Sequence, residues 1–196
     1  VEVVLRVYRN QANGKPADAL RQAITTANSE IYARGAQSDE LRGMGTTVSA
    51  LLLLPEEAII AHVGDSRAYR FRNNKLSPIS KDHSLVQELI DQGRITEEEA
   101  FVHPQRNVIT RALGIGDSIK VDRKNLPLEY GDLVLFCTDG LCGYVEAADL
   151  EEIINSEYKP EGTDLKKLAE MLIKGACLNG GGDNISVCLY QHLQKF

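Results

Sequence analysis

The stretch that decides the fold is residues 132–141, DLVLFCTDGL. Residues 132–137 have the length of a strand and are apolar after Asp132, and Thr138-Asp139-Gly140 follows them as a turn. A carboxylate placed directly after a buried strand lies at the edge of a sheet. The stretch therefore predicts a core strand that presents Asp139 at its end.

A second carboxylate occupies the mirror position at the start of the last predicted strand. Gly180-Gly181-Gly182 ends a helical pattern, Asp183 follows, and residues 184–190 read as a strand. If this strand pairs antiparallel with residues 132–137, both carboxylates lie at one sheet edge, with space left by the glycines. Oxygen ligands in such a place suit hard cations such as Mg²⁺ or Mn²⁺. Taken alone, each motif is more typical of an ordinary Asp turn.

A third acidic motif, Gly64-Asp65-Ser66-Arg67, lies between two apolar strands. Alone it is typical of a hairpin whose aspartate bonds its own turn backbone. Asp65, Asp139 and Asp183 each lie at a strand terminus, however. Together they predict one carboxylate-lined metal site.

The rest of the chain alternates irregularly between short strands and helices. Strands outnumber helices and do not alternate regularly with them, which predicts an α+β fold and disfavours a doubly wound parallel sheet. The length of 196 residues suits one domain. We expect helices over 1–8 (with a strand as the alternative), 16–35, 84–93, 96–99, 147–155 and 164–177, and further strands over 46–54, 58–63, 67–72 and 75–79.

Charge and composition narrow the class of protein. With 28 acidic and 22 basic residues the formal net charge is −6, which argues against a nucleic-acid partner. No signal peptide and no apolar stretch of membrane-spanning length is evident. We interpret the four cysteines as buried thiols of a cytoplasmic protein, with a disulfide or zinc role as the minor alternative. They are Cys137, Cys142, Cys177 and Cys188.

A series of motifs, in order along nearly the whole chain, resembles the bacterial-type metal-dependent protein serine/threonine phosphatases of the protein phosphatase 2C family. Together the motifs are highly specific. They are GMGTT at 43–47, AHVGDSRAY at 61–69, DHS at 82–84, HPQRNVITRALG at 103–114, TDGL at 138–141 and GDN at 182–184.

The resemblance implies a fold and a metal centre. The fold is a four-layer α-β-β-α sandwich of two antiparallel sheets flanked by helices, forming one phosphatase domain over 1–196 with a flap at about 82–114. Asp139 and Asp183 are implied as ligands of a Mn²⁺ or Mg²⁺ pair, and Asp65, with Asp139, as a ligand of a third, weaker metal. No side chain is the nucleophile, because a metal-activated water takes that role.

The flap contains further candidate site residues. His83, His103 and Arg106 belong to it and could approach a substrate. A structural role is the favoured alternative for the two histidines.

The resemblance also implies an activity: hydrolysis of phosphoserine and phosphothreonine in proteins, reversing Ser/Thr kinase signalling. The expected partners are phosphorylated substrates of such a kinase, and the expected state is a monomer. The alternative is a non-catalytic pseudophosphatase that binds partners. The family's D-G-x-G-G motif has no match here, since the only Asp-Gly is Asp139-Gly140. We therefore expect this chain to lack the family's first strands and the ligand that bridges both metals.

Overall fold

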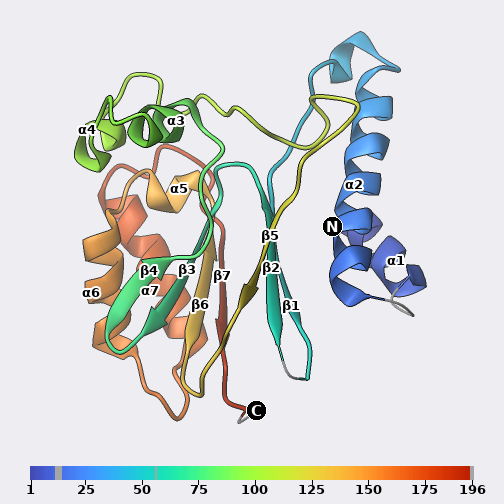
Figure 1. The fold of residues 1–196 in the computed structure, drawn as a ribbon. Helices are drawn as coiled ribbons and strands as arrows, with labels where there is room; N and C mark the ends of the chain where they lie inside the picture. Colours follow the sequence, from blue (N-terminus) through green and yellow to red (C-terminus); the bar gives the residue numbers. More distant parts are fainter. Residues whose placement is uncertain (12–14, 56, 195–196) are drawn as a thin grey trace. The chain divides into compact units, whose positions relative to one another are not determined.

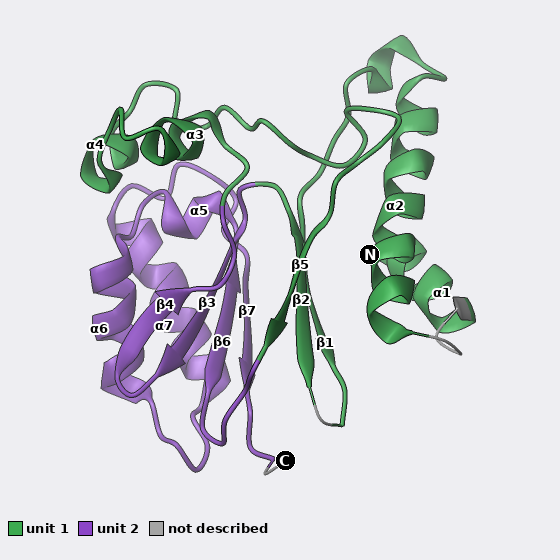
Figure 2. Cartoon of the chain, viewed as in Figure 1, with its two compact units in different colours: residues 1–64, 82–126 green, residues 65–81, 127–196 purple. Residues whose placement is uncertain are grey.

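The computed structural model describes residues 1–11, 15–55 and 57–194, and it contains two compact units (Figures 1 and 2). Unit 1 comprises residues 1–64 and 82–126, and unit 2 comprises residues 65–81 and 127–196. Each unit has one antiparallel sheet with its own helices. In the described part of the chain, no helix is long and apolar enough to span a membrane.

Unit 1 is built on a long helix and a sheet of order β1-β2-β5. The predicted helix over 16–35 is confirmed, with Pro16 in its first turn. Its apolar stripe, including Leu20 and Ile24, packs in a core with Ala61 and Val63 of the fully buried β2. The elements are α1 (Glu2–Gln11), α2 (Pro16–Gly35), the 3-10 helix η1 (Asp39–Leu41), β1 (Val48–Leu53), β2 (Ala58–Val63) and β5 (Asp122–Leu126).

The flap of unit 1 carries two short helices, α3 (Leu85–Asp91) and α4 (Glu97–Phe101). Ser84 caps α3, and Thr96 forms a capping box at α4. An isolated bridge between Ser84 and Ile109 closes the base of this excursion. The flap is therefore joined to the rest of unit 1 through a narrow stem, the two chain segments that pair at Ser84 and Ile109.

Over residues 65–81 and 127–194, unit 2 has a four-stranded sheet of order β4-β3-β6-β7 and three helices. Leu133 and Leu135 on β6 are fully buried, in one core with Leu168 and Leu172 of α7. Asn73 and Asn74, both at positive φ, make the tight turn from β3 to β4. The elements are β3 (Arg67–Arg72), β4 (Lys75–Pro78), β6 (Leu133–Cys137), α5 (Asp139–Cys142), α6 (Ala147–Glu157), α7 (Leu165–Leu178) and β7 (Val187–Gln191).

The predicted fold class, two antiparallel sheets flanked by helices, is confirmed. The interpretation of all four cysteines as buried is wrong for two of them. Cys137 and Cys142 are buried, whereas Cys177 and Cys188 are exposed. Their apolar neighbours misled the prediction, because Cys188 alternates with more buried positions along β7.

Candidate metal centre

The three candidate carboxylates lie at one end of the sheet in unit 2. Strand β6 pairs antiparallel with β3 and with β7, and Cys137 is opposite Arg67 on one side and Val187 on the other. The chain therefore leaves β6 at the end where it enters β3 and β7. Asp139 follows β6, Asp65 precedes β3 and Asp183 precedes β7. The pairing that the sequence prediction required is present.

Thr138 ties the two strand ends together. Its hydroxyl accepts a hydrogen bond from the Ser186 N–H at 3.0 Å and donates one to the Asn184 carbonyl at 3.2 Å. Its own N–H donates to the Ser186 carbonyl at 3.2 Å. These bonds continue the β6–β7 ladder past the end of the strands. They fix the segment after Asp183 against the residue before Asp139.

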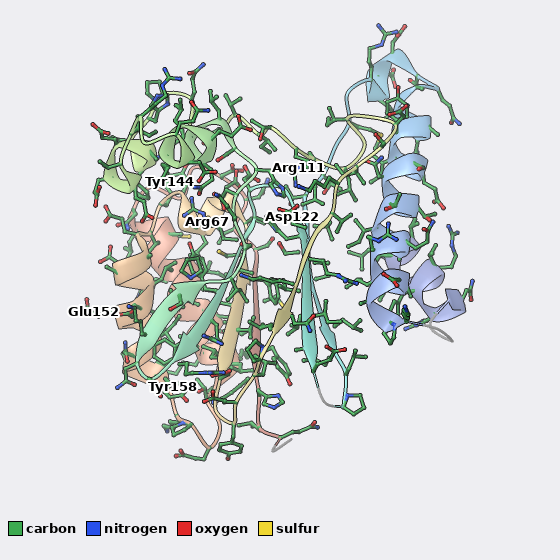
Figure 3. All side chains as sticks on the ribbon, viewed as in Figure 1. Arg67, Arg111, Asp122, Tyr144, Glu152 and Tyr158 are labelled. Atoms are coloured by element: carbon green, nitrogen blue, oxygen red, sulfur yellow. The ribbon has the colours of Figure 1, made fainter. Side chains whose placement is uncertain are left out.

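Glycines allow the two acidic turns to approach closely. A Cβ placed on Gly140 would lie 2.2 Å from the Asn184 carbonyl oxygen, so any larger residue would push the turns apart. A Cβ on Gly182 would lie 2.5 Å from the Tyr144 hydroxyl. Tyr144, labelled in Figure 3, follows α5, which Figure 1 shows at this end of the sheet. Close packing at these positions thus explains why glycine stands beside each of the two aspartates.

Each aspartate of the pair is oriented by its own turn. Oδ1 of Asp139 accepts from the Gly140 N–H at 3.0 Å, and Oδ1 of Asp183 accepts from the Asn184 N–H at 2.6 Å. Both residues are exposed, whereas Asp65 is half-buried. Such bonds also occur in ordinary Asp turns, so they do not by themselves identify a ligand.

The chemistry of these donors fits a hard cation with a partly aqueous shell. Carboxylates from two turns, held at one sheet end, match the way Mg²⁺ is bound by one or two carboxylates plus waters and substrate oxygens. Across residues 1–11, 15–55 and 57–194, no group of three or more His, Cys, Asp or Glu side chains is placed to hold a metal. The structure therefore brings Asp139 and Asp183 together through Thr138, but it does not form a three-carboxylate cage with Asp65.

The candidate flap residues all have partners inside unit 1. Nδ1 of His103 accepts from the Gln105 N–H at 3.1 Å. Arg106 donates to the Phe101 carbonyl at 2.9 Å, and its guanidinium lies 6.0 Å from the centre of the Phe101 ring. His83 is buried and bonds to Gly64. Each has a structural role, and contact with a substrate stays a prediction.

Several residues that shape this centre were not singled out from the sequence. Thr138, Asn184 and Tyr144 act through the pairing of distant segments, which a linear pattern does not reveal. The adjacent motifs T-D-G and G-D-N contain two of them, and these motifs were the available signal.

Comparison with known proteins places the chain in a family. The sequence model of protein phosphatase 2C matches residues 3–185. The serine/threonine phosphatase stp of Listeria monocytogenes is 38% identical over 172 residues, covering 88% of this chain and 66% of that protein. The protein phosphatase PhpP of Streptococcus pneumoniae is 39% identical over 162 residues, covering 83% and 63%. The chain thus spans slightly less than two thirds of the length of these curated relatives.

Solved structures agree with this result. The serine/threonine phosphatase PstP/Ppp of Mycobacterium tuberculosis matches with a TM-score of 0.85 at 33% identity, covering 99% of this chain and 81% of that one. A catalytic domain of PstP in complex with two manganese ions matches with a TM-score of 0.79 at 30% identity, covering 98% and 80%. The chain belongs to the protein phosphatase 2C family.

Proposed function

We propose that this protein is a metal-dependent protein serine/threonine phosphatase, with one phosphatase domain over 1–196 and a flap at about 82–114. The observation that carries the proposal is the Thr138 clamp, which holds the turns of Asp139 and Asp183 together at one end of the unit 2 sheet. The names of the relatives support the same activity.

Asp139 and Asp183 are the proposed ligands of a Mn²⁺ or Mg²⁺ pair, and Asp65 is the proposed ligand of a third metal. When bound, such metals activate a water for attack on phosphorus and offset charge on the phosphoryl oxygens. The protein's part is to hold the carboxylates: Thr138 sets their spacing, and the Gly140 and Asn184 amides orient one oxygen of each. Neither aspartate is proposed as a nucleophile.

The proposed substrates are proteins phosphorylated on serine or threonine by a Ser/Thr kinase, handled by a cytoplasmic monomer. The flap is the proposed element that shapes access for the phosphoprotein, with His103 and Arg106 on it. The PstP structure with manganese supports Mn²⁺ as the first metal to test.

The test is phosphate release from a phosphothreonine peptide by the full-length gene product. Activity should require Mn²⁺ or Mg²⁺ and be lost with a chelator. Asp139→Asn and Asp183→Asn should each lower kcat/KM by about 10²-fold or more, since loss of ligand geometry alone costs that much. Asp149→Asn, an exposed position in the first turn of α6, is the matched control and should be neutral.

Two outcomes would contradict the proposal. Unchanged activity in both ligand variants would place the centre elsewhere. A full-length protein that binds the phosphopeptide but releases no phosphate at any Mn²⁺ concentration would favour the alternative, a non-catalytic pseudophosphatase that binds partners.

A further inference from the structure

His83 lies at the base of the flap and holds the residue that precedes Asp65. The ring is 7% exposed. The His83 N–H donates to the Gly64 carbonyl at 2.8 Å, and the His83 carbonyl accepts from the Thr110 N–H at 2.8 Å. His83 therefore links the flap stem to the Gly64 turn through its main chain.

The His83 ring holds the same glycine through a second bond. Nδ1 of His83 is 2.9 Å from the Gly64 amide nitrogen. Because a peptide N–H can only donate, Nδ1 must be the unprotonated acceptor, and the neutral ring carries its proton on Nε2. Nε2 is 3.0 Å from Oδ2 of Asp122, which accepts that proton's hydrogen bond. The geometry thus fixes the tautomer.

Arg111 and Asp122 fix the orientation of the His83 ring on its Nε2 side. Nη1 of Arg111 donates to Oδ1 of Asp122 at 2.9 Å. The same nitrogen lies 2.8 Å from Nε2 of His83, so Asp122 is the acceptor shared by both donors. Burial raises the pKa of Asp122, but the hydrogen bond from His83 and the charge of Arg111 outweigh it and hold that pKa below its usual value. Figure 3 labels Arg111 and, just below it, Asp122.

Gly64 is further immobilised by its other contacts. Its carbonyl also accepts from Nε2 of the buried His62 at 2.9 Å. Its φ is +118°, a conformation that favours glycine, and a Cβ there would lie 2.3 Å from Cγ2 of Thr47. The N–H and the carbonyl of Gly64 are thus both bonded to histidines, and the next residue in the chain is Asp65.

We propose that His83 is a positioning residue for the metal ligand Asp65: its Nδ1 holds the Gly64 amide, and Asp122 with Arg111 holds the ring. This inference rests on the proposed function, because it needs Asp65 to bind a cation. His83 would thus orient a metal ligand without binding the metal itself. Substitution of such a residue typically weakens metal binding by about 10-fold or more. His83 is not proposed to touch substrate or metal.

Two substitutions separate the two sides of the ring. His83→Asn keeps an acceptor oxygen near the position of Nδ1 but cannot reach Asp122. His83→Gln places an amide near Nε2 but offers the Gly64 N–H no acceptor. In calorimetric Mn²⁺ titrations of the full-length protein, His83→Gln should weaken the Asp65-dependent step by about 10-fold. His83→Asn should weaken that step by clearly less, and the Mn²⁺-binding steps that do not depend on Asp65 should keep their affinity in both variants.

A second measurement needs neither a variant nor a metal. Long-range ¹H–¹⁵N correlation spectra of the metal-free protein should show His83 with its proton on Nε2. A proton on Nδ1 would overturn the inference, because the Gly64 N–H would then have no acceptor. In the metal-free proteins, the Gly64 amide should exchange faster in His83→Gln than in His83→Asn.

The outcomes distinguish this inference from the function on which it rests. A wild-type protein that binds no Mn²⁺ would overturn both. A wild-type protein that binds Mn²⁺ with an Asp65-dependent step, which His83→Gln leaves unchanged, would overturn the role of His83 alone.

Discussion

Replacing Thr138 by valine tests whether the clamp between β6 and β7 builds the metal centre. Valine keeps the shape of threonine and carries a methyl group in place of the hydroxyl. That hydroxyl makes two hydrogen bonds, with the Ser186 N–H at 3.0 Å and with the Asn184 carbonyl at 3.2 Å. Each such bond contributes about 0.5–1.5 kcal/mol net to stability. Thr138 is only half-buried, so water replaces part of what is lost.

We therefore expect Thr138→Val to lower the free energy of unfolding by about 1–2 kcal/mol. We also expect Thr138→Val to weaken Mn²⁺ binding. Without the clamp the repulsion between Asp139 and Asp183 opens the turns, and a bound cation must close them again. If about 1 kcal/mol of the loss falls on this closure, Mn²⁺ affinity falls about fivefold.

The assay is urea unfolding without metal, followed by calorimetric Mn²⁺ titration of the folded protein. Thr138→Ser is the matched control, because it keeps the hydroxyl, and it should stay within a few-fold of wild type in Mn²⁺ affinity. If Thr138→Val lost stability but bound Mn²⁺ as tightly as Thr138→Ser, the clamp would not set the spacing of the carboxylates.

The remaining predictions concern the flap, a buried ion pair and acid stability. Amides of residues 84–109 should exchange faster than those of β6, because the flap is held by a narrow stem; equal protection would contradict a mobile flap. Arg72→Leu should lower the free energy of unfolding in urea by about 3–5 kcal/mol, because it leaves a buried carboxylate without its partner. Nε of Arg72 donates to Oδ1 of Asp132 at 2.6 Å, and Asp132 is 2% exposed. A loss under about 1 kcal/mol would refute this prediction. The folded-state pKa of Asp122 is lowered, so its stabilisation is present above the unfolded value of about 3.9 and is lost as pH falls through the lower folded value. Asp122→Asn should flatten the stability profile below about pH 4, and an unchanged acid profile would contradict the lowered pKa.

The sequence predicts elements well where apolar periodicity and end signals agree. The helix over 16–35 and the strands over 58–63 and 67–72 have the bounds of α2, β2 and β3. Strand β5 was missed because Asp122–Leu126 is mostly polar and exposed, with only its last residue buried. Helix α5 was missed because its four residues are too few to show a helical period.

The site was predictable to the level of strand ends and no further. Placing Asp139 after one strand and Asp183 before another required only local patterns and the assumption of antiparallel pairing, which β6 and β7 bear out. The Thr138 clamp could not be predicted, because it joins residues 46 and 48 positions apart in sequence. The bonds around His83 were missed for the same reason.

The central claim is that Asp139 and Asp183 together bind the metal, and calorimetric titration of the full-length protein with Mn²⁺ tests it most directly. Wild type and the control Asp149→Asn should bind Mn²⁺ with the same affinity and stoichiometry. Asp139→Asn and Asp183→Asn should each weaken the tightest step by at least about 10-fold, since each removes a carboxylate ligand. Full-affinity Mn²⁺ binding in the Asp139→Asn, Asp183→Asn double variant would contradict the account.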